Sequence, residues 1–361
     1  MFSGKFGAMA AAALLAFAAA PSNAQRPIEI DIGASWEHPH SGITVPATLG
    51  EIDRGRATEY APDFLNIGFS FRSEGPYEEL SVYIYRRTNG GVPVWFEQAR
   101  TGIEIRDIYT GANLAFGVEQ YGWPGAEGWQ GQRAIYSLPE TPDIASTGLA
   151  LFSVDGWLVK MRASSETRSP EELAALMDQA FAELTPPDPS TPQEPAIAVV
   201  DCEEKLKFKK AKDAKQDGAA SLLGALLGGV VADKMAEADG ETPTQAQPAV
   251  AWCRDASISP MQVAYRANAS TDAYLIALND SGMGVSVGPD MAAQLFAEEG
   301  KKSKIPYAIT VITDTQRINF VSQNRLPSLE RVLEVINANR TTGSVSTWGD
   351  DKSVKINSDA L

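Results

Sequence analysis

Histidine is scarce in this chain of 361 residues, which holds only His38 and His40. The segment Gly284-Val-Ser-Val-Gly288 matches the G-x-S-x-G pattern, in which a strand-to-helix turn exposes a nucleophilic serine, here Ser286. A hydrolase of that kind needs a histidine after the serine as its general base, and both histidines precede Ser286. We therefore predict no hydrolase site there, and no other motif has the residues that would complete a catalytic site.

The same scarcity argues against a metal centre. Glu37, His38 and His40 surround Pro39, but alternate residues that flank a proline seldom converge on one ion. No cluster of cysteine, histidine or acidic residues at ligand spacing accompanies them. We predict that they are loop residues, and we predict no metal or other cofactor.

A surplus of positive charge is also absent. The chain has 31 lysine and arginine residues against 46 aspartate and glutamate residues, a net charge of −15. Nucleic acid is therefore an unfavourable partner, because its phosphates attract basic proteins. Past the N-terminus no apolar run reaches the ~20 residues that a membrane-spanning helix needs, so we expect no transmembrane span in the mature chain.

The N-terminus has the features of a secretory signal peptide. Lys5 precedes an apolar run at 8–20, and the small residues Ser22 and Ala24 stand where a signal peptidase reads them. We predict cleavage after Ala24 and a periplasmic location. A bacterial envelope protein is favoured over a eukaryotic secreted one, because so long a chain has only two cysteines and an alanine-rich leader.

A proline-rich segment divides the mature chain. Residues 185–195 contain five prolines and no large apolar side chain, which indicates an extended linker. The predicted organisation is a signal peptide at 1–24, a first domain at 25–184, the linker at 185–195, a second domain at 196–348 with a flexible insertion at 205–248, and a tail at 349–361.

The first domain is predicted to be an antiparallel sheet covered by helices, in the α+β class. Alternation at 80–85, the turn residues 89–91 and the apolar run 92–96 predict a β-hairpin, and 149–152 with 157–161 predict a second one. A helix begins at Pro170, since Ser169 and Glu172 form a capping box.

The second domain is predicted to be a smaller α+β unit. Its expected strands are at 197–200, 273–278, 307–312 and 318–321, and its expected helices are at 289–299 and 328–337. The chain after Thr341 is polar, and we expect it to be frayed.

The first domain resembles the PsbP-like group. The resemblance rests on Trp36-Glu-His-Pro-His-Ser-Gly-Ile-Thr-Val-Pro46, on the hairpins, and on the last strand Gly156–Arg162 followed by a capped helix. It implies a non-catalytic accessory or binding domain with an antiparallel sheet and a helix packed across it. It transfers no functional residue.

Cys202 and Cys253 are the only cysteines. In an exported protein two cysteines are usually joined, so we predict a disulfide. A redox-active pair is the alternative, but the C-x-x-C spacing that lowers a thiol pKa is absent.

A basic run follows Cys202. Its members are Lys205, Lys207, Lys209, Lys210, Lys212 and Lys215. An almost chargeless apolar stretch follows at 218–232. One interpretation is a contact with an anionic membrane or a partner, and the other is a flexible insertion clamped by the disulfide.

Three functions remain. We expect an exported, non-catalytic accessory or binding protein of the bacterial envelope, whose partner is an envelope protein or the membrane surface. The alternatives are a periplasmic enzyme with a dispersed acidic or polar site in the second domain, and a membrane-surface protein that acts through 205–232. Tyr121, Trp123 and Trp129 are a candidate contact surface, unless they are core residues.

Overall fold

The computed structural model of the chain describes residues 25–189, 193, 195–214, 249–291, 293, 305–350 and 353–357. The predicted signal peptide, Lys215, the apolar stretch at 218–232 and most of the predicted helix at 289–299 lie outside the described residues. Among the helices that are described, none combines the length and the apolar character needed to cross a membrane.

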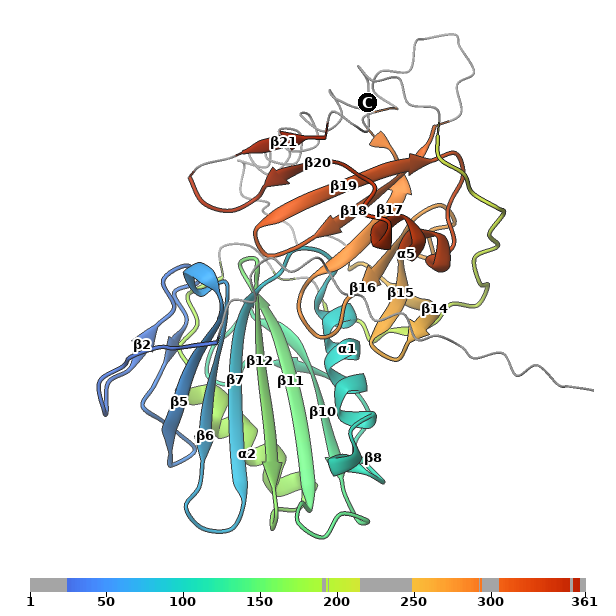
Figure 1. Cartoon of the computed structure of the whole chain (residues 1–361). Coiled ribbons are helices and arrows are strands. Elements are labelled where there is room, and N and C mark those ends of the chain that lie inside the picture. Colours follow the sequence, from blue (N-terminus) through green and yellow to red (C-terminus); the bar gives the residue numbers. More distant parts are fainter. Residues whose placement is uncertain are drawn as a thin grey trace, which may run out of the picture.

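Antiparallel β-sheet dominates the described chain (Figure 1). One sheet, called here the first sheet, has ten strands. In spatial order these are β1 (Arg26–Pro27), β5 (Ile52–Ala61), β6 (Asn66–Arg72), β7 (Glu78–Arg86), β12 (Trp157–Ser165), β11 (Ser146–Val154), β10 (Gln130–Ser137) and β8 (Asn113–Leu114), with β4 (Thr48–Leu49) paired to β5 and β9 (Glu119–Gly122) paired to β10. Two short strands, β2 (Trp36–Glu37) and β3 (Thr44–Val45), pair separately.

The second sheet has nine strands in the order of the chain. They are β13 (Val200–Asp201), β14 (Trp252–Ser259), β15 (Gln262–Ala267), β16 (Tyr274–Ala277), β17 (Gly284–Pro289), β18 (Tyr307–Ile312), β19 (Gln316–Gln323), β20 (Thr341–Ser346) and β21 (Val354–Ile356). The described helices are η1 (Pro62–Phe64), α1 (Val92–Glu104), η2 (Asp107–Tyr109), α2 (Pro170–Glu183) and α5 (Leu329–Asn337).

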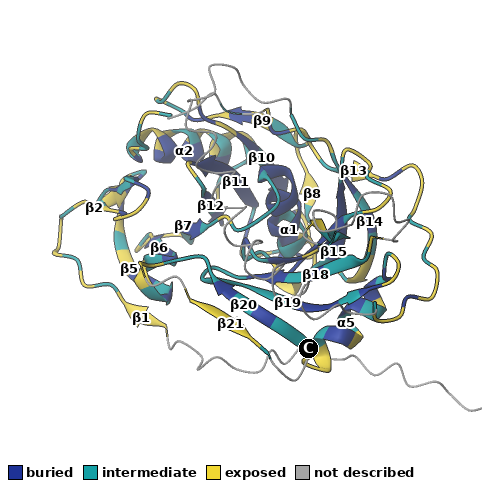
Figure 2. Ribbon diagram, turned by 90° about the horizontal axis from the view of Figure 1, so that it is seen from above, coloured by how far each residue is buried: buried dark blue, intermediate teal, exposed yellow. Residues whose placement is uncertain are grey.

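Helix α2 begins as predicted. The Ser169 side chain accepts a hydrogen bond from the Glu172 amide, and the Glu172 carboxylate accepts one from the Ser169 amide, which completes the capping box. Leu173, Met177 and Phe181 are buried in one apolar core with residues of the first sheet. This core lies on one face of the sheet (Figure 2).

The hairpin of β11 and β12 is also confirmed. Val154 pairs with Trp157 across a two-residue turn, and both turn residues, Asp155 and Gly156, have positive φ. That conformation gives the twist that antiparallel strands need, and glycine adopts it without steric cost.

The other predicted hairpin is wrong in its second half. Residues 80–85 lie in β7, but 92–96 form the first turns of α1. Gly91 is the N-cap of this helix and Pro93 lies in its first turn, where a missing amide proton costs nothing. A short apolar run does not by itself distinguish a buried strand from a buried helix.

Helix α1 is apolar on several sides because it lies between the two sheets. Trp95 and Phe96 belong to a buried core that also contains Leu149 and Leu151 of the first sheet and Leu275 of the second. On the first sheet α1 contacts β10 and β11, on the face opposite to α2 (Figure 2). The contacts of α1 with the first sheet are concentrated on these two strands.

The second sheet follows several of its predicted elements. Strand β18 spans the predicted 307–312, 318–321 lies inside β19, and α5 matches the helix expected near 328–337. The expectation of a frayed chain after Thr341 is wrong, because β20 pairs along β19 and the Trp348 ring packs against the first sheet. A polar strand that is covered on one side carries no long apolar run.

We expect Phe181→Ala to lower the free energy of unfolding by about 3–5 kcal/mol, because it leaves a cavity among Trp123, Phe152 and α2. Urea unfolding followed by circular dichroism measures the loss. Ile32→Ala, at a fully exposed apolar residue, is the control and should change the value by less than about 0.5 kcal/mol. Equal effects of the two substitutions would contradict the assigned core.

Candidate functional site

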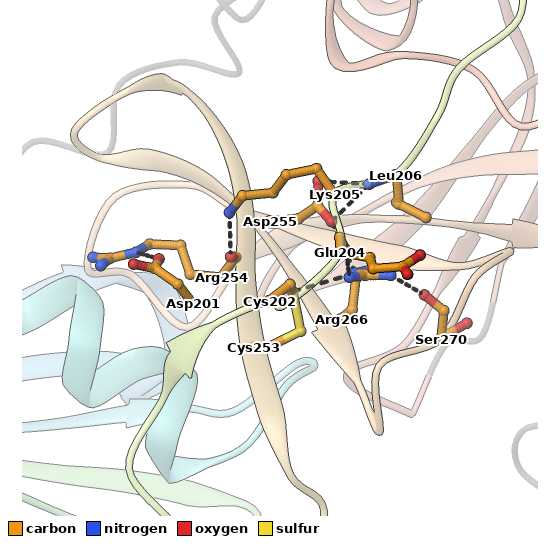
Figure 3. The surroundings of a disulfide bond; sticks show 10 residues. All are labelled: Asp201, Cys202, Glu204, Lys205, Leu206, Cys253, Arg254, Asp255, Arg266 and Ser270. Atoms are coloured by element: carbon orange, nitrogen blue, oxygen red, sulfur yellow. Dashed lines mark hydrogen bonds and ion pairs between the residues drawn. A yellow bond between two sulfur atoms is a disulfide. The ribbon is translucent and has the colours of Figure 1, made fainter.

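Cys202 and Cys253 form the predicted disulfide, within a network of buried polar contacts (Figure 3). Arg266 of β15 is almost fully buried and pairs with Asp255 at 2.9 Å. Its Nε donates to Cys202 Sγ at 3.3 Å, and its Nη1 donates to the Ser270 carbonyl at 2.9 Å. The disulfide therefore joins the residues just before the predicted insertion at 205–248 to strand β14, and it acts as a structural cross-link.

The described lysines of the basic run are all exposed and lie along an extended segment. Leu206 and Phe208, which alternate with them, pack against the core beside α5. The Lys205 ammonium donates to the Arg254 carbonyl at 3.0 Å, whereas Lys207 and Lys209 are exposed next to the half-buried Leu206 and Phe208. A role of these lysines in membrane or partner contact stays a prediction.

Ser286 lies in the middle of strand β17. It pairs with Leu275 on one side and Thr310 on the other, and its side chain is exposed. The strained strand-to-helix turn of a nucleophile elbow is not formed at this position. The G-x-S-x-G pattern here is an ordinary strand of an antiparallel sheet.

His38 is a buried structural residue. Its Nδ1 accepts a hydrogen bond from the Ser41 amide, and its Nε2 lies 3.0 Å from the Phe64 carbonyl, to which it therefore donates. The contact with Ser41 requires the neutral ring, because a protonated Nδ1 cannot accept a hydrogen bond. Burial lowers the pKa of His38 to about 4, an effect that the Phe64 carbonyl opposes and His40 reinforces.

His40 lies at a junction between the two sheets. Its ring is parallel to Trp157 at 5.8 Å and meets Trp348 edge-on at 4.8 Å. The Trp348 indole donates to Asp63 Oδ2 at 2.6 Å, and the Arg86 guanidinium lies over the Trp348 ring at 4.8 Å. These residues connect the two sheets. Among the described residues no three potential ligands are grouped around a common point.

Tyr121, Trp123 and Trp129 are core residues. Each is less than 10 % exposed, and Trp123 and Trp129 donate their indole protons to backbone carbonyls of Phe181 and Pro187. The interpretation as a contact surface is therefore wrong. A second group of aromatic side chains, three of them half-buried, lies on the face of the first sheet that carries α1.

We call this region the tyrosine face. It consists of Tyr60, Tyr77, Glu79, Ser81, Tyr83, Tyr109, Lys160 and Arg162, on β5, β7, η2 and β12. Three of its tyrosines are half-buried, and Tyr109 is buried. Gly68 makes room for two of them, since a Cβ there would lie 2.9 Å from Tyr60 and 3.0 Å from Tyr83.

Lys160 and Asp280 close one end of the tyrosine face. The Lys160 ammonium makes a short ion pair with Asp280, from a loop of the second sheet, and lies 4.7 Å from the centre of the Tyr83 ring. Tyr85 donates to the same carboxylate at 3.2 Å. Burial first, and then the negative charge of Asp280, raise the pKa of Tyr85.

The opposite end of the face is held by hydrogen bonds among phenols, hydroxyls and one carboxylate. Tyr77 donates to Glu79 at 2.9 Å, and Ser81 donates to its other oxygen at 3.4 Å. Burial and the Glu79 charge raise the pKa of Tyr77. The Tyr77 phenol is therefore neutral at physiological pH, and it can donate and accept hydrogen bonds but is a poor base.

The tyrosine face was not identified from the sequence, although one signal was present. Along β7 the apolar Leu80, Val82 and Ile84 alternate with Ser81 and Tyr83, which predicts a strand with one polar side. The alternation does not reveal that Tyr60, Tyr109 and Arg162 meet this side from other segments.

Comparisons of the chain with protein-family models, with curated proteins and with solved structures found no match. The resemblance to the PsbP-like group stays a prediction.

We expect the free energy of unfolding to fall as the pH drops from about 6.5 to about 4. In this range the unfolded chain takes up a proton at His38, whereas the folded ring stays neutral because its pKa is about 4. The loss should total about 3 kcal/mol and level off below pH 4. His38→Gln keeps a donor but does not titrate, so its pH dependence in urea unfolding should be weaker. Equal slopes in the two proteins would contradict this assignment.

We expect the unreduced, denatured protein to show no reactive thiol, because Cys202 and Cys253 are joined. Removing the cross-link by Cys202→Ser with Cys253→Ser should lower the free energy of unfolding by about 4 kcal/mol, since it frees a loop of 51 residues in the unfolded chain. Thiol labelling with mass spectrometry and urea unfolding measure the two effects. Labelling of both cysteines without reductant would contradict the disulfide.

Proposed function

We propose that this protein is an exported, non-catalytic binding protein of the bacterial envelope, and that the tyrosine face is its recognition surface. The observation that carries the proposal is the gathering of Tyr60, Tyr77 and Tyr83, all half-buried, on one side of the first sheet, where Tyr77 and Tyr83 border the core that contains α1. Tyrosine offers a large, rigid contact area with a hydroxyl that can pair with either donors or acceptors, and for this reason it is enriched in binding sites.

The rigidity of this face supports recognition. It lies on paired strands β5, β6, β7 and β12, and the Lys160–Asp280 ion pair ties its edge to the second sheet. A surface that is already ordered loses little conformational entropy when a partner binds.

Two carboxylates in the second part of the chain are held by arginines, which favours a structural role for them over a catalytic one. Asp255 pairs with Arg266, and Asp213 pairs with Arg331 and Arg340, each at 2.7 Å. Its arginine partners keep the pKa of Asp213 below its usual value. A carboxylate held in this way is a weak general base.

The envelope location rests on the signal peptide at 1–24, and the accessory role agrees with the PsbP-like resemblance of the first part. We infer that the first sheet with α2 forms the domain at 25–184 and that the second sheet with α5 forms the other, with α1 between them. This division supports a binding protein in which the second unit borders the recognition surface of the first.

Capture from an envelope extract tests the proposal. We expect immobilised mature protein to retain a component that the variant Tyr60→Ser with Tyr77→Ser does not retain, because the variant lacks two of the contact side chains. Quantitative mass spectrometry of the retained fractions measures the difference. The control is Tyr307→Ser, at a half-buried tyrosine of β18 in the second sheet. A component retained equally by all three proteins would place the binding surface elsewhere.

A further inference from the structure

Arg162 lies at the centre of the tyrosine face. It is on β12, two residues from Lys160 and two from Ser164, so the three side chains share one side of the sheet. Its guanidinium carbon is 5.4 Å from the centre of the Tyr109 ring. Tyr109 is in turn held by a hydrogen bond of 3.3 Å between its hydroxyl and that of Ser164.

One edge of the Arg162 guanidinium has no partner within the described part of the chain. Its Nε and Nη2 are both buried and make no hydrogen bond there. These two nitrogens lie on the same side of the planar group, so their N–H bonds point in parallel directions. A buried donor without an acceptor is costly, and a charged one more so.

Several other cations of the first sheet or next to it have acidic partners. Lys160 pairs with Asp280, Arg133 pairs with Asp178 at 2.7 Å, and Arg168 pairs with Glu78. Glu79, the carboxylate on the tyrosine face, instead accepts from Tyr77 and Ser81. Elsewhere in the described residues, the buried side-chain atoms without a partner belong to the neutral amides of Asn89 and Gln98. Among these buried atoms without a partner, the charged group is that of Arg162.

We propose that the free edge of Arg162 binds the carboxylate of a ligand that also carries an aromatic ring. Two parallel N–H donors match the two oxygens of a planar carboxylate, which gives a bidentate pair. The rings of Tyr77, Tyr83 and Tyr109 around this position suit an aromatic body next to the carboxylate. The proposal rests on the tyrosine face as a binding surface and names the chemical class of its ligand.

Benzoate is the probe for this site. Isothermal titration of the whole mature protein should show binding of benzoate, and binding of benzamide should be at least about tenfold weaker because it lacks the anionic oxygens. Arg162→Met should weaken benzoate binding by a similar factor. Arg56→Met, which removes an exposed cation from strand β5 of the same sheet, is the matched control and should bind benzoate as the wild type does.

A second variant guards against misfolding. Arg162→Lys keeps the charge but loses the parallel donors, so it should bind benzoate more weakly while its melting temperature and circular dichroism match those of the wild type. In the wild type, benzoate should raise the melting temperature, and this shift should be absent in Arg162→Lys.

Three results would overturn the proposal: no benzoate binding by the wild type, equal binding by Arg162→Met, or tighter binding of phenyl phosphate than of benzoate, which would point to a phosphate ligand.

The capture experiment with the tyrosine variant is independent of these titrations. If capture depends on Tyr60 and Tyr77 but benzoate does not bind, the ligand class is wrong and the binding surface stands. If benzoate binds at Arg162 but capture is unchanged, the surface takes a small molecule and its role in retaining an envelope component is wrong.

Discussion

The burial of α1 between two sheets is the constraint on which the rest of the structure depends. Its apolar side chains contact Leu149 and Leu151 on one sheet and Leu275 on the other, so a single core continues from sheet to sheet. Gln98 adds a hydrogen bond of 2.7 Å to the Tyr265 hydroxyl across the same boundary. Because α1 lies over β10 and β11, the tyrosines gather on the other strands of this side of the sheet, where η2 adds Tyr109.

Charge has a mainly structural use in this acidic protein. Arg86 donates to the Thr347 carbonyl at 2.8 Å and stacks on Trp348, so a first-sheet arginine anchors the second sheet. Within the second sheet, Arg266 pairs with Asp255 and donates to Cys202 of the disulfide. Arg162 differs from these arginines, because its buried Nε and Nη2 have no hydrogen-bond partner among the described residues.

Local signals predicted those elements that depend on neighbouring residues alone. The capping box at Ser169 and the two positive-φ residues after Val154 are decided within four residues, and both were correct. The run 92–96 resembles a strand in the sequence because every residue in it is apolar. It is apolar because it is enclosed on several sides, and neither the helical nor the strand period of apolar residues reveals such enclosure. Trp123 and Trp129 lie in a glycine-rich segment whose sequence does not reveal burial. They therefore resemble surface residues in the sequence, although they are core residues in the structure. The tyrosine face needed contacts among four elements, and no spacing along the chain encodes them.

The sequence by itself determined the disulfide pair, because the chain has two cysteines, and it determined the ends of α2 and the turn before β12, because capping and turn geometry are local. The tertiary structure alone decided that residues 92–104 are a helix, that His38 is buried and neutral, and that Arg162 lies among tyrosines from other segments. The physical reason is that burial and pairing depend on which segments meet. A residue's own neighbours in the chain specify its backbone conformation far better than they specify what its side chain contacts.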